Sequence, residues 1–315
     1  MPLLDVVLGY DCNLACTYCT ITPEMRLRML PTERIAKEID RAALRGFRDI
    51  AFTGGEPTIR PDLIALVKYA KKRGFVQLKV ASNGLRYAHL PYLEALADAG
   101  VNQFHVSMHA LQDDAYDATV QREGSAILRK QAIANLVGKN LKPIADLILK
   151  EDTYRDARAW VIALADQGVR DFRLWLVSLT DGNAKNTHQL PKISAVAEAV
   201  KEALDVARDR NLDVRSLHIP RCFLPGYEAH VHHPGADLVT VVTPDDVFDL
   251  KDSRLSGGVK PLVCKQCVYD DVCPGLRADY IALHGDAEPR AAAIGVSPQT
   301  PRGLLALDPR KGPAP

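Results

Sequence analysis

The chain has 315 residues, of which 47% are apolar, and it carries 40 Lys plus Arg against 39 Asp plus Glu. This length suits one large domain or a core domain with a small module, and the apolar share is enough for a sizeable core. The charge balance gives no electrostatic footprint for nucleic acid or an anionic membrane. No run approaches the roughly 18 apolar residues of a membrane span, and the N-terminus lacks a signal peptide. We therefore expect a cytoplasmic protein.

From residue 3 to residue 211, short apolar runs alternate with amphipathic stretches. The runs predict buried parallel strands at 3–8, 49–53, 77–81, 103–108, 142–149 and 171–179. The stretches predict helices at about 31–45, 60–73, 89–99, 125–140, 154–167 and 192–210. Six βα units in succession predict a parallel sheet, either an incomplete barrel or a doubly wound sheet. In both folds, ligands bind at the carboxyl ends of the strands.

The regular pattern ends near residue 211, and the chain divides there. Residues 1–211 are predicted to form the barrel or sheet domain. Residues 212–285 hold the last four cysteines without a long periodic helix, which indicates a small irregular module that a metal orders. Residues 286–315 contain six prolines and three glycines, a composition that predicts a mobile tail.

Three of the seven cysteines, Cys12, Cys16 and Cys19, follow the first predicted strand directly. Thiolates at such short spacing can converge on one metal centre, and soft sulfur ligands favour iron–sulfur clusters or zinc. Three ligands for a four-iron cluster leave one iron open to a substrate or cofactor, as in the open position of catalytic zinc sites.

The spacing Cys12-x3-Cys16-x2-Cys19, with Tyr18 before the last cysteine, resembles the signature of the radical S-adenosylmethionine (radical SAM) enzymes. In that family three thiolates hold a 4Fe–4S cluster, and SAM chelates the fourth iron. A structural zinc knuckle is the alternative, but no His or fourth Cys lies near enough in sequence to close it. The resemblance covers about residues 3–185 and implies an α/β fold with a partial (β/α)6 TIM-like barrel.

Further polar residues end the predicted strands, as a SAM site requires. The run after the second strand resembles the family's GGE motif, which holds the SAM amino group, and consists of Gly54, Gly55, Glu56 and Pro57. Asn83 ends the third strand and Ser107 the fourth, at positions where the resemblance implies further SAM contacts. Ordinary turn chemistry is the alternative for both. It is the favoured interpretation for Lys150, Thr180 and Asp181, which follow the fifth and sixth strands.

The remaining cysteines, Cys222, Cys264, Cys267 and Cys273, supply four thiolates. Four cysteines can ligate a second 4Fe–4S cluster, and an all-thiolate zinc site is the lesser alternative. The Cys-x2-Cys-x5-Cys core resembles the auxiliary-cluster modules called SPASM and twitch. The full SPASM pattern has another cysteine where this chain has Arg277, so the resemblance implies one auxiliary cluster of the shorter twitch type. Such a cluster suits electron transfer or a structural role.

The resemblance implies an oxidoreductase or maturase-type enzyme that reductively cleaves SAM to a 5′-deoxyadenosyl radical. The radical abstracts hydrogen from a peptide or a small metabolite, which leads to oxidation, crosslinking or epimerisation. A reductase such as flavodoxin or ferredoxin would supply the electron. Two alternatives are weighed against it. Radical SAM modification of nucleic acid is disfavoured by the charge balance, and a zinc-stabilised scaffold without catalysis leaves the GGEP run unexplained.

Overall fold

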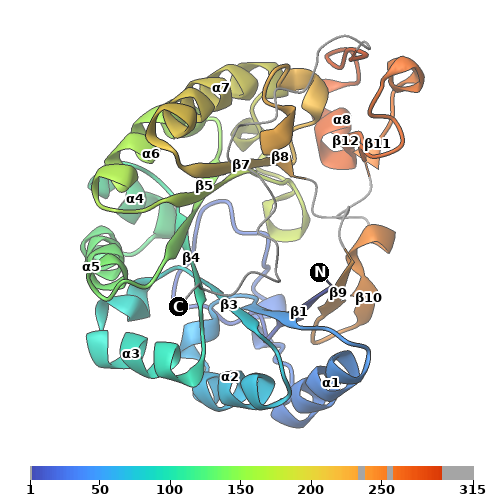
Figure 1. Ribbon diagram of the computed structural model, residues 1–315. Coiled ribbons are helices and arrows are strands. Elements are labelled where there is room, and N and C mark those ends of the chain that lie inside the picture. The colour runs from blue at the N-terminus through green and yellow to red at the C-terminus, as the bar shows by residue number, and fades with distance from the viewer. Residues whose placement is uncertain (1, 233–237, 254–257, 293–315) are drawn as a thin grey trace, which may run out of the picture.

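The structure is a computed structural model that describes residues 2–232, 238–253 and 258–292. Its centre is a curved ten-stranded sheet with helices around the outside (Figure 1). The strand order is β10-β9-β1-β2-β3-β4-β5-β6-β7-β8, and every pair from β9 to β8 is parallel, whereas β10 is antiparallel to β9. The chain therefore has the partial TIM-like barrel that the sequence predicted.

The six strands and six helices expected from the hydrophobic pattern all form, with ends shifted by three residues at most. The strands are β1 (Leu3–Val7), β2 (Asp49–Thr53), β3 (Gln77–Ser82), β4 (Gln103–Met108), β5 (Pro143–Leu149) and β6 (Asp171–Leu176). The helices are α1 (Thr32–Leu44), α2 (Leu63–Lys72), α3 (Leu90–Ala99), α5 (Ser125–Gly138), α6 (Ala157–Asp166) and α7 (Ile193–Arg210). The largest shifts, of three residues, fall at the starts of α2 and α6 and at the end of the sixth strand, which ends at Leu176 and not at residue 179.

The structure also contains elements that the pattern did not predict. Two are helices, α4 (Asp113–Val120) and α8 (Ala278–His284). Four strands extend the main sheet, and two pair separately; they are β7 (Asp213–Leu217), β8 (Val231–His232), β9 (Val239–Val242), β10 (Val247–Asp249), β11 (Gly258–Val259) and β12 (Leu276–Arg277). The sheet thus continues past the boundary predicted at residue 211. Strands of two to four residues, such as β8 to β12, carry too little periodicity to predict, and β9 pairs with β1 from the other end of the chain.

The two faces of the sheet differ in polarity. Phe104 and Val106 of β4 pack into the main hydrophobic core under the helices, and His105 between them points to the inner face. There its Nδ1 lies 2.9 Å from a carboxylate oxygen of Asp146, and Trp175 Nε1 donates to the other oxygen at 3.1 Å. TIM-barrel interiors are usually filled by branched apolar side chains. A hydrogen-bonded polar network lines part of this one.

Arg277 joins the C-terminal region to the end of the barrel. Its guanidinium donates to the carbonyls of Leu176 and Val177 at 3.0 and 2.6 Å and forms an ion pair with Asp279 at 2.8 Å. Asp279 also accepts the N–H of Leu179 at 2.8 Å. Burial alone would raise the pKa of Asp279, but hydrogen bonds and charge from Arg277 hold that pKa below its usual value. The residue that replaces the expected cysteine therefore docks the module on β6.

Across the described residues, no helix combines the length and the apolar character needed to cross a bilayer.

Replacing Arg277 with Ala should loosen this contact. The substitution leaves the Asp279 carboxylate half-buried without its cation and frees two strand-end carbonyls, which should lower the free energy of unfolding by about 2–4 kcal/mol. Urea unfolding followed by circular dichroism measures the change. Arg155→Ala is the matched control, because Arg155 pairs with Glu151 on the exposed surface, and it should leave the midpoint unchanged. Equal midpoints for both variants would contradict the docking role.

Candidate active site

Cys12, Cys16 and Cys19 lie on the loop that follows β1, and the loop after β2 holds its first half. The N–H of Gly55 donates to the Gly9 carbonyl at 2.9 Å, and the N–H of Glu56 donates to the Asp11 carbonyl at 2.8 Å. A Cβ on Gly55 would stand 2.1 Å from the Asp11 oxygen. The two segments therefore approach so closely that only glycine fits at position 55.

Two other segments hold the second half of the cysteine loop. The N–H groups of Ala15 and Thr17 donate at 3.2 and 2.9 Å to carbonyls at the C-terminal end of α4, whose last turn has these acceptors to offer. From the loop after β6, the N–H of Gly182 donates to the Thr20 carbonyl at 2.8 Å. Neither the helix nor this contact was predicted from the sequence.

The Arg26 side chain contacts the cysteine loop and places a positive charge near Cys12 and Cys16. It donates to the carbonyls of Cys12 and Leu14 at 3.1 and 2.7 Å. Burial raises the pKa of Cys12 to about 11 and that of Cys16 to about 12, and the neighbouring thiols add to the rise at Cys16, whereas the charge of Arg26 opposes it. These thiols are therefore protonated at neutral pH in the absence of metal, and each would lose its proton on binding a metal centre. The donor set thus fits the three-thiolate iron–sulfur site.

The Glu56 carboxylate is a junction between two strand-end loops. It is 3% exposed and accepts hydrogen bonds from both the N–H and the hydroxyl of Thr58, at 2.9 and 2.5 Å. It also accepts from the Ser82 hydroxyl at 2.8 Å and the Asn83 N–H at 2.7 Å. Burial raises the pKa of Glu56, and these hydrogen bonds oppose the rise. The sequence assigned this carboxylate to SAM, and the structure surrounds it with four donors of the protein itself.

Asn83 follows β3 and contacts the cysteine loop, and Ser107 lies on the neighbouring strand β4. The Asn83 amide donates to the side-chain oxygen of Asn13 at 2.8 Å and lies 4.0 Å from the Cys12 sulfur. Ser107 is paired in register with Asp146 of β5, next to the polar network of the inner face. Pro57 begins the short turn Pro57–Ile59 that follows Glu56.

The sequence did not predict a buried cluster formed by Tyr18, His109 and Lys150. The Tyr18 hydroxyl and His109 Nδ1 share a hydrogen bond. Burial, together with the charges of Lys150 and Arg129, lowers the pKa of His109 to about 3, so this imidazole is neutral. Lys150 is 1% exposed, pairs with Asp152 at 2.5 Å and lies 5.6 Å from the centre of the Tyr18 ring. A lysine at a strand end gives no signal of such burial in the sequence.

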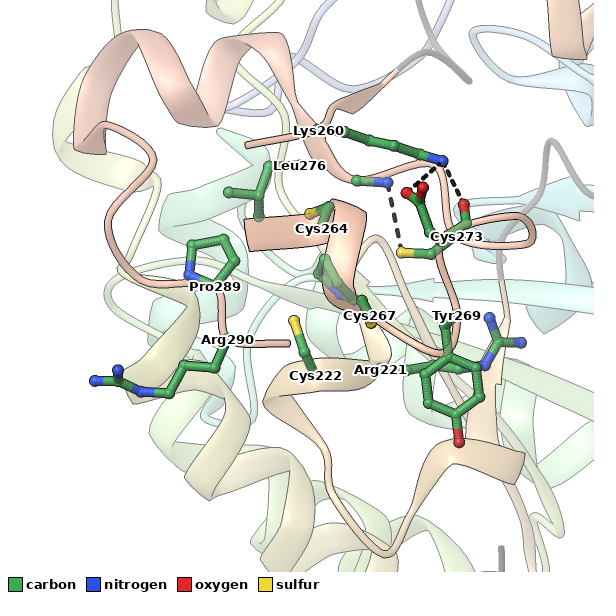
Figure 2. A pocket seen from close by; sticks show the side chains of 13 residues that line it. Arg221, Cys222, Lys260, Cys264, Cys267, Tyr269, Cys273, Leu276, Pro289 and Arg290 are labelled. Atoms are coloured by element: carbon green, nitrogen blue, oxygen red, sulfur yellow. Dashed lines mark hydrogen bonds and ion pairs between the residues drawn. The ribbon is translucent and has the colours of Figure 1, made fainter. Parts of the chain in front are cut away.

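The other four cysteines lie together on one pocket, although Cys222 is distant from the rest in sequence (Figure 2). Cys222 follows β7, Cys264 lies in the short helix Leu262–Gln266, Cys267 follows that helix, and Cys273 accepts the Gly275 N–H at 3.5 Å. Burial raises the pKa of Cys222 to about 11, and the other three thiols contribute to the rise. Within the described part of the chain, no three His, Cys, Asp or Glu side chains converge at the spacing of a single metal ion.

The fold and the cysteine loop together define an α/β barrel that carries a cofactor site at the carboxyl ends of its strands. Residues 6–158 match the family described as the Radical SAM superfamily. The barrel region of the chain therefore carries a radical SAM domain, and this family implies a 4Fe–4S cluster and SAM as cofactors.

Several curated relatives share one name. The chain is 25% identical over 283 residues to a probable GTP 3′,8-cyclase of Sulfurisphaera tokodaii, covering 88% of this chain and 86% of the relative. It is 35% identical over 141 residues to a GTP 3′,8-cyclase of Pelotomaculum thermopropionicum, but there it spans 42% of each protein.

Solved structures show the same fold at low sequence identity. Streptococcus suis SuiB bound to S-adenosylmethionine superposes with a TM-score of 0.67 at 11% identity, covering 93% of this chain and 77% of SuiB. The structure of anSMEcpe with bound AdoMet and the Cp18Cys peptide gives 0.63 at 16% identity, with 92% of both chains covered.

Replacing Gly55 with Ala should disrupt the first cysteine site. The added methyl collides with the Asp11 carbonyl and moves the loop away from β2, so reconstituted protein should hold about four fewer irons. Gly138→Ala is the control, because no atom lies within 4 Å of the Cβ it would add, and it should keep the full iron content. Iron analysis and the absorbance of the cluster compare the two. A fully loaded Gly55→Ala protein would show that the close approach is dispensable.

Proposed function

We propose that this enzyme cleaves SAM at a 4Fe–4S cluster held by Cys12, Cys16 and Cys19 and abstracts hydrogen from a small polar substrate inside the barrel. The observation that carries the proposal is the fixed cysteine loop, held by segments that follow β2, β4 and β6 at one edge of the barrel. With cluster and SAM bound, one electron splits SAM into methionine and a 5′-deoxyadenosyl radical. The chain's own residues hold the loop, position SAM and exclude water.

We assign the SAM site to the strand ends beside the loop. Gly54 and Gly55 bring backbone close to the loop, and Asn83 and Ser107 add polar groups from β3 and β4. The Glu56 carboxylate accepts three protein hydrogen bonds at Oε1 and one at Oε2, so we assign it the role of holding the loops after β2 and β3 together, with Oε2 left to contact the SAM amino group.

The polar inner face favours a small polar substrate over an apolar one. Burial lowers the pKa of His105, helped by the charges of Lys79 and Arg173 and opposed by Asp146, and the pKa of Asp146 is lowered too. A neutral imidazole beside an ionised carboxylate offers hydrogen bonds to a polar ligand. Curated relatives named GTP 3′,8-cyclase point the same way. GTP is therefore the first compound to test, and a peptide is the second.

We assign the pocket of Cys222, Cys264, Cys267 and Cys273 to a second 4Fe–4S cluster, on the chemistry of four thiolates around one cavity. Complete protein ligation suits electron transfer, and removal of an electron from a substrate radical makes net oxidation possible. Zinc is the alternative for this site. For the electron donor of the first site we propose a reductase such as flavodoxin or ferredoxin.

The decisive experiment uses anaerobically purified protein reconstituted with iron and sulfide. We expect about eight irons with matching labile sulfide, and 5′-deoxyadenosine when dithionite and SAM are added. About four irons with 5′-deoxyadenosine, and zinc in the metal analysis, would assign zinc to the second site. Absence of both iron and SAM cleavage would refute the proposal.

Two cysteine variants serve as controls for each other. Cys16→Ala should abolish 5′-deoxyadenosine formation, because the first cluster loses one of three ligands. Cys267→Ala should lower the iron content by about four and retain SAM cleavage, because it removes a ligand of the second cluster alone. Iron analysis and chromatography of 5′-deoxyadenosine measure both. SAM cleavage by Cys16→Ala would disprove the assignment of the first site.

A further inference from the structure

The chain after α8 passes along the second cysteine pocket. Pro289 and Arg290 line this pocket together with the four cysteines. Figure 2 shows the backbone at Arg290 beside Cys222, with the guanidinium group pointing away from the sulfur atoms. We call residues 288–292 the C-terminal strap. The strap lies within the segment that the sequence composition assigned to a tail.

Glu288 anchors the first residue of the strap. One carboxylate oxygen accepts the Ser194 hydroxyl at 2.6 Å, and the other accepts the hydroxyl of Tyr280. Tyr280 is buried, and its hydroxyl in turn accepts the Ile193 N–H at 2.9 Å. Glu288 thus connects the strap to the first turn of α7 and to α8, both of which pack into the main hydrophobic core.

The other end of the strap contacts the cysteines themselves. The Ala292 carbonyl accepts the N–H of Val268, the residue after Cys267, at 3.2 Å. On the opposite side, Arg290 lies beside Cys222 in the lining of the pocket. The strap therefore bridges Cys222 on one side of the pocket and the loop of the late cysteines on the other.

We infer that the C-terminal strap is a wall of the second cysteine site and holds Cys222 in place beside Cys264, Cys267 and Cys273. Two physical effects support this role. Pro289 and Arg290 cover one side of the pocket from water. The anchors at Glu288 and Ala292 also restrict two segments that are remote in sequence and whose closure is otherwise entropically costly. The inference rests on the second cluster proposed above.

Two truncated chains that differ only by the strap test this inference. The chain 1–292 keeps the strap, and the chain 1–287 lacks it. After reconstitution, we expect about eight irons in the first and about four in the second. Both should form 5′-deoxyadenosine from SAM with dithionite, because the first site is untouched. Electron paramagnetic resonance of the reduced proteins should show the loss of one cluster signal in 1–287.

A point variant guards against a general folding defect. Glu288→Ala in the full chain should also lose the second cluster, whereas Asp286→Ala, two residues earlier and outside the strap, should keep both. About eight irons in 1–287 or in Glu288→Ala would overturn the inference. So would equal loss of iron from 1–292 and 1–287, because residues beyond the strap would then be responsible. If the full chain itself holds about four irons and cleaves SAM, the second cluster of the proposed function fails instead.

Discussion

The cysteine loop after β1 depends on backbone hydrogen bonds from elements far from it in sequence. N–H groups of the loop after β2 donate to the carbonyls of Gly9 and Asp11. Carbonyls of α4 accept two N–H groups of the cysteine loop, and an N–H of the turn after β6 donates to the Thr20 carbonyl. Parallel strands bring these segments to one edge of the sheet. These backbone contacts hold the loop that carries the three thiols, and the side chains of Arg26 and Asn83 add hydrogen bonds to it.

The barrel separates two chemical environments by the alternation of its strands. Outward residues such as Phe104 join the hydrophobic core, and inward residues such as His105 and Asp146 form a hydrogen-bonded network. Buried polar groups are costly unless they are paired, and here each partner is supplied by the neighbouring strand. The same geometry that builds the core therefore leaves a polar surface where the radical would act.

The C-terminal region gains its position from charge and from the strap. Arg277 donates hydrogen bonds to carbonyls at the end of β6 and forms an ion pair with Asp279. The cysteine-rich segment therefore lies at the end of the barrel that carries the first site. Glu288 then ties the following residues to α7 and α8. The placement of the second cysteine set relative to the barrel rests on these polar contacts and on Leu276 and Tyr280, which are buried in the main hydrophobic core.

The sequence alone determined the strands and, except for α4, the helices up to Arg210, because long apolar periods report burial directly. It also located the first three cysteines, whose chemistry follows from local spacing. Tertiary structure decided the rest. The short strands β7, β8 and β9 form by pairing with partners that are remote in sequence. The burial of Lys150, the four donors around Glu56 and the gathering of Cys222 with the late cysteines likewise arise from contacts between distant residues. Local patterns carry no record of such contacts, since each depends on how the parallel sheet brings its strand ends together.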